Sequence, residues 1–472
     1  MTALKTKKYT STGSSWFLIE EGLAPVLEQY SHPGNKRRHY AVFDFRGTKI
    51  FVKSFLESGF VGFIRRMLCS RGKVEFTIGG RLSDLGISTP KVFGYGTAHN
   101  MSAVVEEYVD GPSLLYEIKR EPDHRHLLTL LANLLKELSL KHVRHDDLHL
   151  DNILVRNDRL YLIDLHNTRI RKSFGEKDEI SNVMHALGMI YDDIPVDERD
   201  FFFDRYACSM MMKDKIEKSI TNLKHQWVIN KKKRAFRNTS ILNVSSDYVY
   251  IKGSESEANG EFVSFLKKDK KTKVELYSDH IRKVYLHKRR LKKAWENHVV
   301  LAYLGITVAP TAYCMKLPKF TPGYIAMEDL GHKGIELDRF LDGKYDHMSY
   351  SEKIEFVNGL ASFLLFLFRK RILHKDMKGC NIFVLYDGHF ILLDVEDFVF
   401  HEIATDELKK ALVQLNTTIP KRVSTIVRIR FFLKIVSPFT LEKKRLFREV
   451  VKESLGQSIV YEGTAGLKVE NW

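Results

Sequence analysis

One arrangement of residues occurs twice in this chain, and each copy is long enough to constrain the fold. The first copy reads HDDLHLDN at residues 145–152 and reaches Asp164 after an apolar segment, a polar turn and a second apolar segment. The second copy reads HKDMKGCN at residues 374–381 and reaches Asp394 in the same way. Both fit H-x-D-x-x-x-x-N, followed by two strand-like segments and an aspartate. A long internal repeat of this kind is typical of duplicated domains.

Each copy also has an upstream lysine at a matched distance. Lys53 lies in the run IFVKSF and Lys283 in IRKVY, and both runs are typical of strands. The lysine precedes the aspartate of the H-x-D motif by 94 residues in the first copy (147 − 53) and by 93 in the second (376 − 283). We therefore predict an α+β chain of two tandem bilobal protein-kinase-like domains. The N-terminal domain is expected at residues 1–230 and the C-terminal domain at residues 231–472.

The residue types in both copies suit phosphoryl transfer from ATP, which depends on positioning and charge neutralisation. The aspartate of H-x-D can accept the proton of an attacking hydroxyl. The asparagine five residues later and the aspartate after the strands offer the hard oxygen ligands that Mg²⁺ prefers. On this interpretation the catalytic residues are Asp147 and Asp376, the metal ligands are Asn152, Asp164, Asn381 and Asp394, and Lys53 and Lys283 bind the nucleotide phosphates.

The two lysines need acidic partners from the helix that follows each strand. Glu75 is the candidate in the first copy and Glu296 in the second. Measured back from the Leu-Gly pair that ends each helix, the two glutamates are two residues out of register, at 11 and 9 residues (86 − 75 and 305 − 296). Glu107 and Glu328 end strand-like runs that lead into an interlobe hinge, and we assign both to nucleotide binding.

Neither copy contains some of the features that mark regulated protein kinases. There is no G-x-G-x-x-G loop: the first copy offers residues 32–35 and the pair Arg46-Gly47, and the second offers Gly253 and Gly260. Neither metal-binding aspartate is followed by Phe-Gly, and no A-P-E-like segment is present. These absences favour a compact kinase that acts on a small molecule or a glycan.

The net charge of +16 is unevenly distributed. Residues 1–230 carry 33 basic against 30 acidic residues, so +13 of the charge lies in the remainder. Residues 421–434 interleave cations with large apolar residues. This segment can be a helix whose apolar face lies in the core, or an amphipathic helix on an anionic membrane surface. We expect no nucleic-acid partner.

Targeting signals and cysteines favour the cytoplasm. The first 15 residues are polar, without the apolar segment of a secretory signal. The most apolar short run, residues 360–368, is well below the roughly 20 residues of a spanning helix. The four cysteines lack metal-binding spacing and fit a reducing compartment.

In its abbreviated kinase motifs and its L-G-I-x-x-P helix exit, the chain resembles the bacterial lipopolysaccharide kinases, the Kdo/heptose kinase family, as a tandem two-module member. The resemblance implies ATP- and Mg²⁺-dependent phosphorylation of a heptose or Kdo hydroxyl on the lipid-linked core oligosaccharide. It also implies a location peripheral to the inner membrane, at its cytoplasmic face. Lys378 stands where many protein-type kinases place a lysine that contacts the γ-phosphate, whereas the first copy has His149 there.

Two other readings of the sequence stay open. One is a soluble small-molecule or protein kinase. The other is a scaffold in which one module is a pseudokinase, because a fold can persist after its chemistry is lost.

Overall fold

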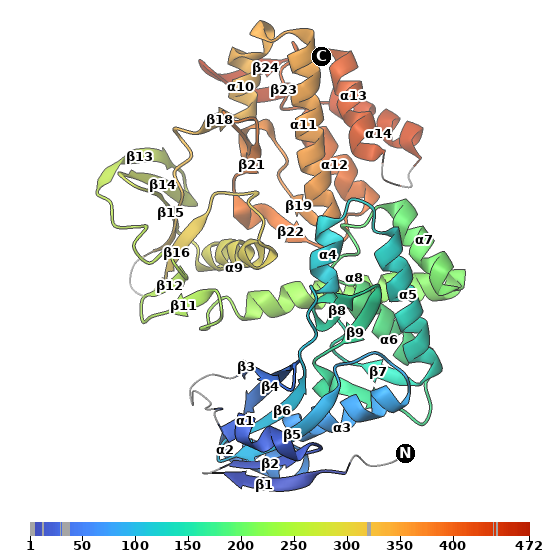
Figure 1. The fold of residues 1–472 in the computed structure, drawn as a ribbon. Coiled ribbons are helices and arrows are strands. Elements are labelled where there is room, and N and C mark those ends of the chain that lie inside the picture. Colours follow the sequence, from blue (N-terminus) through green and yellow to red (C-terminus); the bar gives the residue numbers. More distant parts are fainter. Residues whose placement is uncertain are drawn as a thin grey trace. The chain divides into compact units, whose positions relative to one another are not determined.

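The chain forms two compact units, residues up to Leu223 and residues from Lys224 onward. The structure is a computed structural model, and it describes residues 5–11, 14–28, 30, 38–318, 322–437, 439 and 442–472. Both units are α+β: each begins with a strand-rich part and continues into a helical part (Figure 1). The boundary that we predicted after residue 230 lies inside the helix α8 (Met210–Lys233). This helix contains neither proline nor glycine, so the junction between the units is helical.

The strand-rich part of the first unit is a six-stranded sheet whose neighbouring strands are all antiparallel. In spatial order the sheet contains β1 (Lys7–Ser11), β2 (Ser14–Leu18), β5 (Val92–Ala98), β6 (Met101–Glu107), β4 (Thr48–Leu56) and β3 (Arg38–Phe45). Three helices accompany it: α1 (Ala24–Glu28), α2 (Gly59–Cys69) and α3 (Arg71–Asp84). Residues 32–35, one of the glycine-containing segments noted in the sequence, lie outside the described part of the chain, and the pair Arg46-Gly47 forms the turn between β3 and β4.

The helical part of the first unit is built around α5 (Arg125–Leu140), whose buried leucines recur every three or four residues. These leucines pack with α7 (Val196–Tyr206) in one apolar core. The remaining helices are α4 (Leu114–Arg120) and α6 (Glu176–Leu187). Two small antiparallel pairs carry the motif residues: β7 (Val143–His145) with β10 (Thr168–Ile170), and β8 (Ile153–Arg156) with β9 (Arg159–Leu162).

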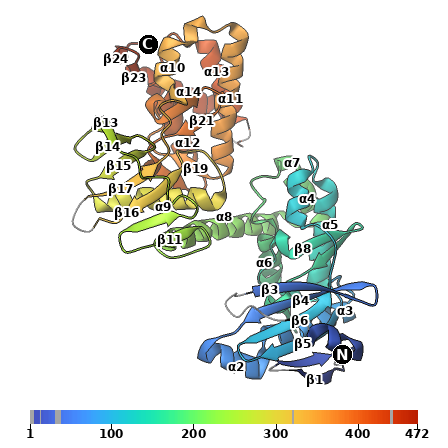
Figure 2. The ribbon, with the colours of Figure 1, turned by 60° about the vertical axis from the view of Figure 1, so that its left-hand side comes forward.

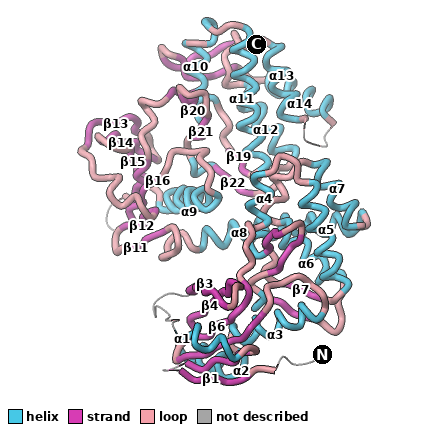
Figure 3. The backbone as a smooth tube through the Cα atoms, viewed as in Figure 1, coloured by secondary structure: helices cyan, strands magenta, loops and turns pink. Residues whose placement is uncertain are grey.

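The second unit also runs from a strand-rich part into a helical part (Figures 2 and 3). Its seven-stranded sheet contains, in spatial order, β11 (Leu242–Val244), β12 (Tyr248–Ile251), β16 (Ala312–Lys316), β17 (Gly323–Met327), β15 (Ile281–Tyr285), β14 (Thr272–Tyr277) and β13 (Phe262–Lys268). The single long helix of this part is α9 (Lys288–Leu304). The strand order β12-β16-β17-β15-β14 repeats the order β2-β5-β6-β4-β3 of the first unit.

The helical part of the second unit surrounds α11 (Tyr350–Arg369), which begins with a capping box between Ser349 and Glu352. The other helices are α10 (Leu337–Gly343), α12 (Thr405–Asn416), α13 (Thr425–Val436) and α14 (Lys443–Leu455). The short strands are β18 (Gly334–Glu336), β20 (Ile382–Leu385) and β21 (Phe390–Leu392) in one sheet, β19 (Ile372–His374) with β22 (Phe398–Phe400), and β23 (Ile459–Gly463) with β24 (Gly466–Glu470).

Backbone conformation repeats between the units at single residues. His142 and Arg371 both have positive φ, at 56° and 60°, and both follow the helix that leads into an H-x-D motif. Gly305 is a left-handed C-cap of α9, and Gly86, which follows the C-cap of α3, has a φ of 77°. Both glycines were expected at helix ends, because only glycine adopts this conformation without strain.

The basic segment at residues 421–434 contains most of α13, and one face of that helix lies in the core. Val427, Phe432 and Ile435 are buried there, as the core reading of this segment required. Arg428 is also engaged internally, since its guanidinium donates to the backbone oxygens of residues 416, 419, 420 and 423. Among the described residues, no helix has both the length and the apolar character needed to cross a bilayer.

Candidate active site

In the first unit, Lys53 joins three elements that lie far apart in the sequence. Its Nζ is 2.9 Å from Oε1 of Glu75 on α3 and 2.7 Å from Oδ1 of Asp164, which follows β9. Lys53 and Glu75 are almost fully buried, and Glu75 also accepts the backbone N–H of Leu165 at 3.2 Å. The predicted Lys53–Glu75 pair is therefore present, and it connects the sheet to the segment that carries Asp164.

Asp164 occupies a strained left-handed backbone conformation, with φ 61° and ψ 49°. Its carboxylate lies 2.7 Å from Nδ1 of His166 and 3.3 Å from the guanidinium of Arg38. Burial opposes the charged form of Asp164, but the hydrogen bond with His166 and the charge of Lys53 outweigh it and hold the pKa of Asp164 well below its usual range. Asp164 is thus held as a carboxylate.

The H-x-D loop of the first unit is ordered by its own side chains. Nδ2 of Asn152 donates to the backbone oxygen of Asp147 at 2.9 Å. Nδ1 of the buried His145 accepts the backbone N–H of Asp147 at 3.1 Å. His149 Nε2 is 3.6 Å from the Asp147 carboxylate, whose side chain is 46% exposed. The loop therefore presents the Asp147 carboxylate to solvent, where a general base must meet its substrate.

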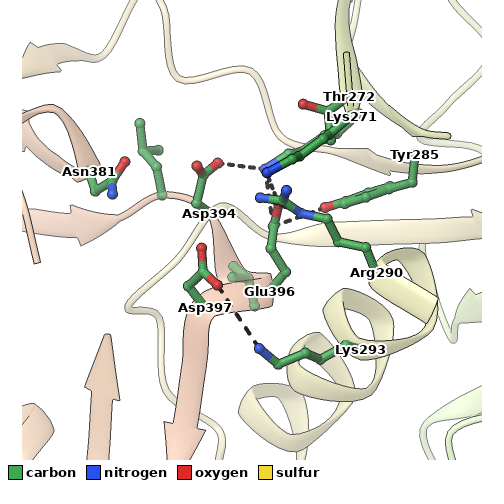
Figure 4. Close-up of polar contacts among 12 residues, drawn as sticks. Lys271, Thr272, Tyr285, Arg290, Lys293, Asn381, Asp394, Glu396 and Asp397 are labelled. Carbon is green, nitrogen blue, oxygen red and sulfur yellow. Dashed lines mark hydrogen bonds and ion pairs between the residues drawn. The ribbon is translucent and has the colours of Figure 1, made fainter. Parts of the chain in front are cut away.

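In the second unit, Lys283 has a different pair of partners, Asp394 and Glu396, both of which are labelled in Figure 4. Its Nζ lies 2.5 Å from Oδ1 of Asp394 and 2.9 Å from Oε1 of Glu396. Glu396 also accepts hydrogen bonds at 3.1 Å from the Tyr285 hydroxyl and from Nε of Arg290. Asp394 shares the left-handed conformation of Asp164, and the charge of Lys283 overcomes the effect of burial and lowers the pKa of Asp394.

The prediction that Glu296 pairs with Lys283 is wrong. Glu296 forms an ion pair with Lys292 on the same helix, at 3.6 Å. The register difference noted between the two copies explains this result, because α9 turns Asn297 and His298 inward instead. Asn297 donates from Nδ2 to the backbone oxygens of Val395 and Phe398, so the helix holds the backbone of the segment whose Glu396 pairs with the lysine.

The H-x-D loop of the second unit has the same internal bonds as the first. Nδ2 of Asn381 donates to the backbone oxygen of Asp376 at 2.8 Å, and Nδ1 of His374 accepts the backbone N–H of Asp376 at 3.2 Å. Nζ of Lys378 lies 2.8 Å from the Asp376 carboxylate. The difference between His149 and Lys378 noted in the sequence thus places a fixed positive charge beside only one of the two aspartates.

The expected hinge glutamates lie at the strand ends, but their side chains contact cations of the protein. Glu107 pairs with Arg156 at 3.0 Å, and Glu328 with Lys333 at 2.5 Å. Sequence reasoning missed Glu106, which is 4% exposed. Burial and the nearby Glu75 raise the pKa of Glu106 to about 8.

The side chains present fit a magnesium ion in both units by their chemistry. Asn152 and Asn381 turn their amide nitrogens toward the loop backbone, which directs each amide oxygen the opposite way. Asp164 and Asp394 contribute carboxylate oxygens, and hard oxygen donors of this kind suit Mg²⁺. Among the described histidines, cysteines and acidic residues, one group could gather its ligand atoms within 4.8 Å: Glu75, Asp164 and His166.

Comparison with known proteins gives one family match. Residues 63–201, which lie within the first unit, match the lipopolysaccharide kinase (Kdo/WaaP) family. A solved structure described as "WaaP in complex with acyl carrier protein" is 20% identical in sequence, with a TM-score of 0.30, over 40% of this chain and 87% of that chain. No curated protein matches this chain.

Proposed function

We propose that this chain is a phosphotransferase of the lipopolysaccharide kinase (Kdo/WaaP) family, whose model matches residues 63–201, and that it phosphorylates a sugar hydroxyl of the lipopolysaccharide core with ATP. The acceptor is a heptose or Kdo residue of a lipid-linked core oligosaccharide. The reaction takes place at the cytoplasmic face of the inner membrane, with the chain bound peripherally. The two units are tandem kinase-like domains, and each binds Mg-ATP.

The observation that supports this proposal best is the contact of Lys53 with both Glu75 and Asp164. Glu75 holds the ammonium group of Lys53 in place. Binding of the nucleotide phosphates by Lys53 therefore requires no further loss of conformational entropy to order its side chain. Asp164 and Asn152 would hold Mg²⁺, which would neutralise charge on the phosphates. Asp147 accepts the proton of the sugar hydroxyl as that oxygen bonds to the γ-phosphorus, and the bond from the γ-phosphorus to the β,γ-bridging oxygen breaks, so that ADP leaves.

The second unit offers a second candidate site, because Lys283, Asp394 and Asn381 occupy the corresponding places. Asp376 is its general base. Lys378 beside Asp376 gives this loop a fixed cation that the first unit lacks, so the two units differ in the acceptor they use. The reading in which one unit is a pseudokinase makes a different prediction in the experiment below.

The test is phosphoryl transfer by the full chain and its Asp147→Ala, Asp376→Ala and double variants, with ATP, Mg²⁺ and dephosphorylated core oligosaccharide. Loss of a general base typically lowers the rate about 10²–10⁴-fold. We expect each single variant to lose the product of one unit and the double variant to lose both, as read by mass spectrometry of the glycan.

The control variant is Asp146→Ala, because the carboxylate of Asp146 pairs with Arg144 instead of entering the loop interior. The melting temperature of every variant is also measured. A single variant without effect identifies its unit as the pseudokinase. Unchanged transfer in the double variant contradicts the catalytic assignment. Transfer to a soluble metabolite or a protein, but not to the core glycan, contradicts the proposed acceptor.

A further inference from the structure

The helix α2 exposes its apolar side chains to solvent. Large apolar residues occupy six of its eleven positions, and all are exposed: Phe60, Val61, Phe63, Ile64, Met67 and Leu68. The exposed fraction reaches 78% at Phe60 and 73% at Leu68. A contiguous exposed patch of this kind on a soluble protein usually marks an interaction surface.

The exposed residues form one continuous face. Positions 60, 61, 63, 64, 67 and 68 are spaced as i, i+1, i+3, i+4, i+7 and i+8, which at 100° per residue covers an arc of about 160°. The buried residue of the helix is Gly62, on the opposite side. A Cβ atom there would lie 2.2 Å from the backbone oxygen of Glu57, so the side of the helix with Gly62 lies against the segment that precedes the helix, and the apolar arc is exposed.

The charged residues of α2 itself, Arg65 and Arg66, are both positive. At 100° per residue, Arg65 lies about 40° beyond one edge of the arc and Arg66 about 60° beyond the other, and Arg71 and Lys73 follow at the start of α3. No acidic residue occurs between positions 58 and 74. Arg66 donates to the backbone oxygen of Glu57, whereas Arg65 and Lys73 are exposed. An apolar arc with cationic edges is the complement of an anionic lipid surface, in which the arc enters the acyl region and the cations meet the headgroups.

We propose that α2 is an in-plane membrane anchor that binds an anionic bilayer through this apolar arc. Its eleven residues extend only about 16 Å, so the helix lies in the interface instead of crossing it. The choice of a membrane as partner rests on the proposed function, because a lipid-linked acceptor is presented at a bilayer. The anchor belongs to the first unit and not to the basic segment at residues 421–434, whose helix keeps one face in the core.

The test is co-sedimentation of the full chain with vesicles, without ATP or acceptor. One set contains phosphatidylcholine and phosphatidylglycerol, and the other phosphatidylcholine alone. We expect binding to the anionic vesicles that weakens between about 0.1 M and about 0.5 M salt. The triple variant Phe60→Gln, Met67→Gln, Leu68→Gln should bind at least about tenfold less. Arg65→Gln should reduce binding about fivefold, and only to anionic vesicles.

The matched control is the double variant Ile426→Gln, Leu433→Gln, which removes exposed apolar groups from α13. It should bind like the parent chain. All of these side chains are exposed and glutamine is a good helix former, so circular dichroism should show unchanged folding. Loss of binding only in the α13 variant, equal binding by all variants, or no vesicle binding by the parent overturns the proposal. A parent dimer that the triple variant abolishes, without vesicle binding, identifies the arc as a contact between copies and also overturns it.

The outcome is separable from that of the proposed function. Asp147→Ala should sediment with anionic vesicles as the parent does, because its substitution lies outside the arc. If the vesicles bind α2 but no core glycan is phosphorylated, the anchor stands and the proposed function fails. If the glycan is phosphorylated in detergent solution but the chain does not bind vesicles, the proposed function stands and the anchor fails.

Discussion

At the scale of single residues, Lys53 and Lys283 both pair with a buried glutamate, but the two glutamates come from different elements. Lys53 pairs with a glutamate from α3, whereas Lys283 pairs with Glu396 from the segment that follows β21. Glu396 is 1% exposed and is contacted by Lys283, Tyr285 and Arg290. A buried carboxylate with several charged or polar partners is costly to remove, because those partners are left unsatisfied.

This contrast can be tested with two glutamates that lie 100 residues apart (396 − 296) in the same unit. Glu396→Gln should lower the free energy of unfolding by about 1–3 kcal/mol, since it removes the negative charge between Lys283 and Arg290. Glu296→Gln should change it by less than about 1 kcal/mol, because its ion pair at 3.6 Å is with Lys292, whose side chain is largely exposed. Denaturant titration of both variants measures the difference. A larger loss in Glu296→Gln would show that the assignment is reversed.

The sequence predicted Lys53, Glu75 and Asp164 together because each lies in a segment with a clear pattern. It could not predict Glu396 as the partner of Lys283. Glu396 does not lie on the helix that follows the lysine's strand, so only the tertiary structure brings the two side chains together. The only sequence signal was a glutamate two residues after Asp394. Glu106 was missed for a similar reason: its burial depends on the elements packed around β6, and a Glu-Glu pair at a strand end reads as solvent-exposed.

At the scale of elements, the position of α3 depends on a close contact with the sheet. Gly72, in the first turn of α3, would place a Cβ atom 2.2 Å from the backbone oxygen of Ala103 on β6. Glu75 follows one turn later on the same helix. The helix can therefore bring Glu75 to Lys53 only because position 72 has no side chain.

Gly72→Ala should displace α3 and lower the stability of the first unit by about 1–3 kcal/mol, with weaker ATP binding at that unit. Gly175→Ala is the matched control, because a Cβ at Gly175 meets no atom within 4 Å and its backbone is extended. Calorimetric melting and nucleotide titration of both variants provide the measurement. Equal behaviour of the two variants would contradict the role given to this contact.

At the scale of the whole molecule, the helical parts of the two units have separate apolar cores. Leu131 lies in the core around α5 and Leu364 in the core around α11, and both are at most 1% exposed. Each unit has the size of an independent domain. Unfolding of the chain should therefore depart from a single two-state transition.

We expect Leu131→Ala and Leu364→Ala each to destabilise its own unit by about 2–5 kcal/mol, since both leave a cavity in a buried core. Differential scanning calorimetry should show two transitions, with each variant lowering a different one. A single transition that both variants lower equally would mean that the two units unfold as one.

The origin of each lysine's partner has a consequence for how the two units can be turned off. In the first unit the partner is carried by α3, so an outward shift of that helix separates Glu75 from Lys53 and leaves the lysine with Asp164. In the second unit Glu396 stands two residues from Asp394, on the segment that Asn297 fastens to α9. A helix movement that displaces Glu396 from Lys283 would therefore also move Asp394, the metal ligand that we propose. Displacement of one helix can therefore break the Lys53–Glu75 ion pair of the first unit, whereas the Lys283–Glu396 ion pair of the second unit does not depend on a glutamate carried by α9.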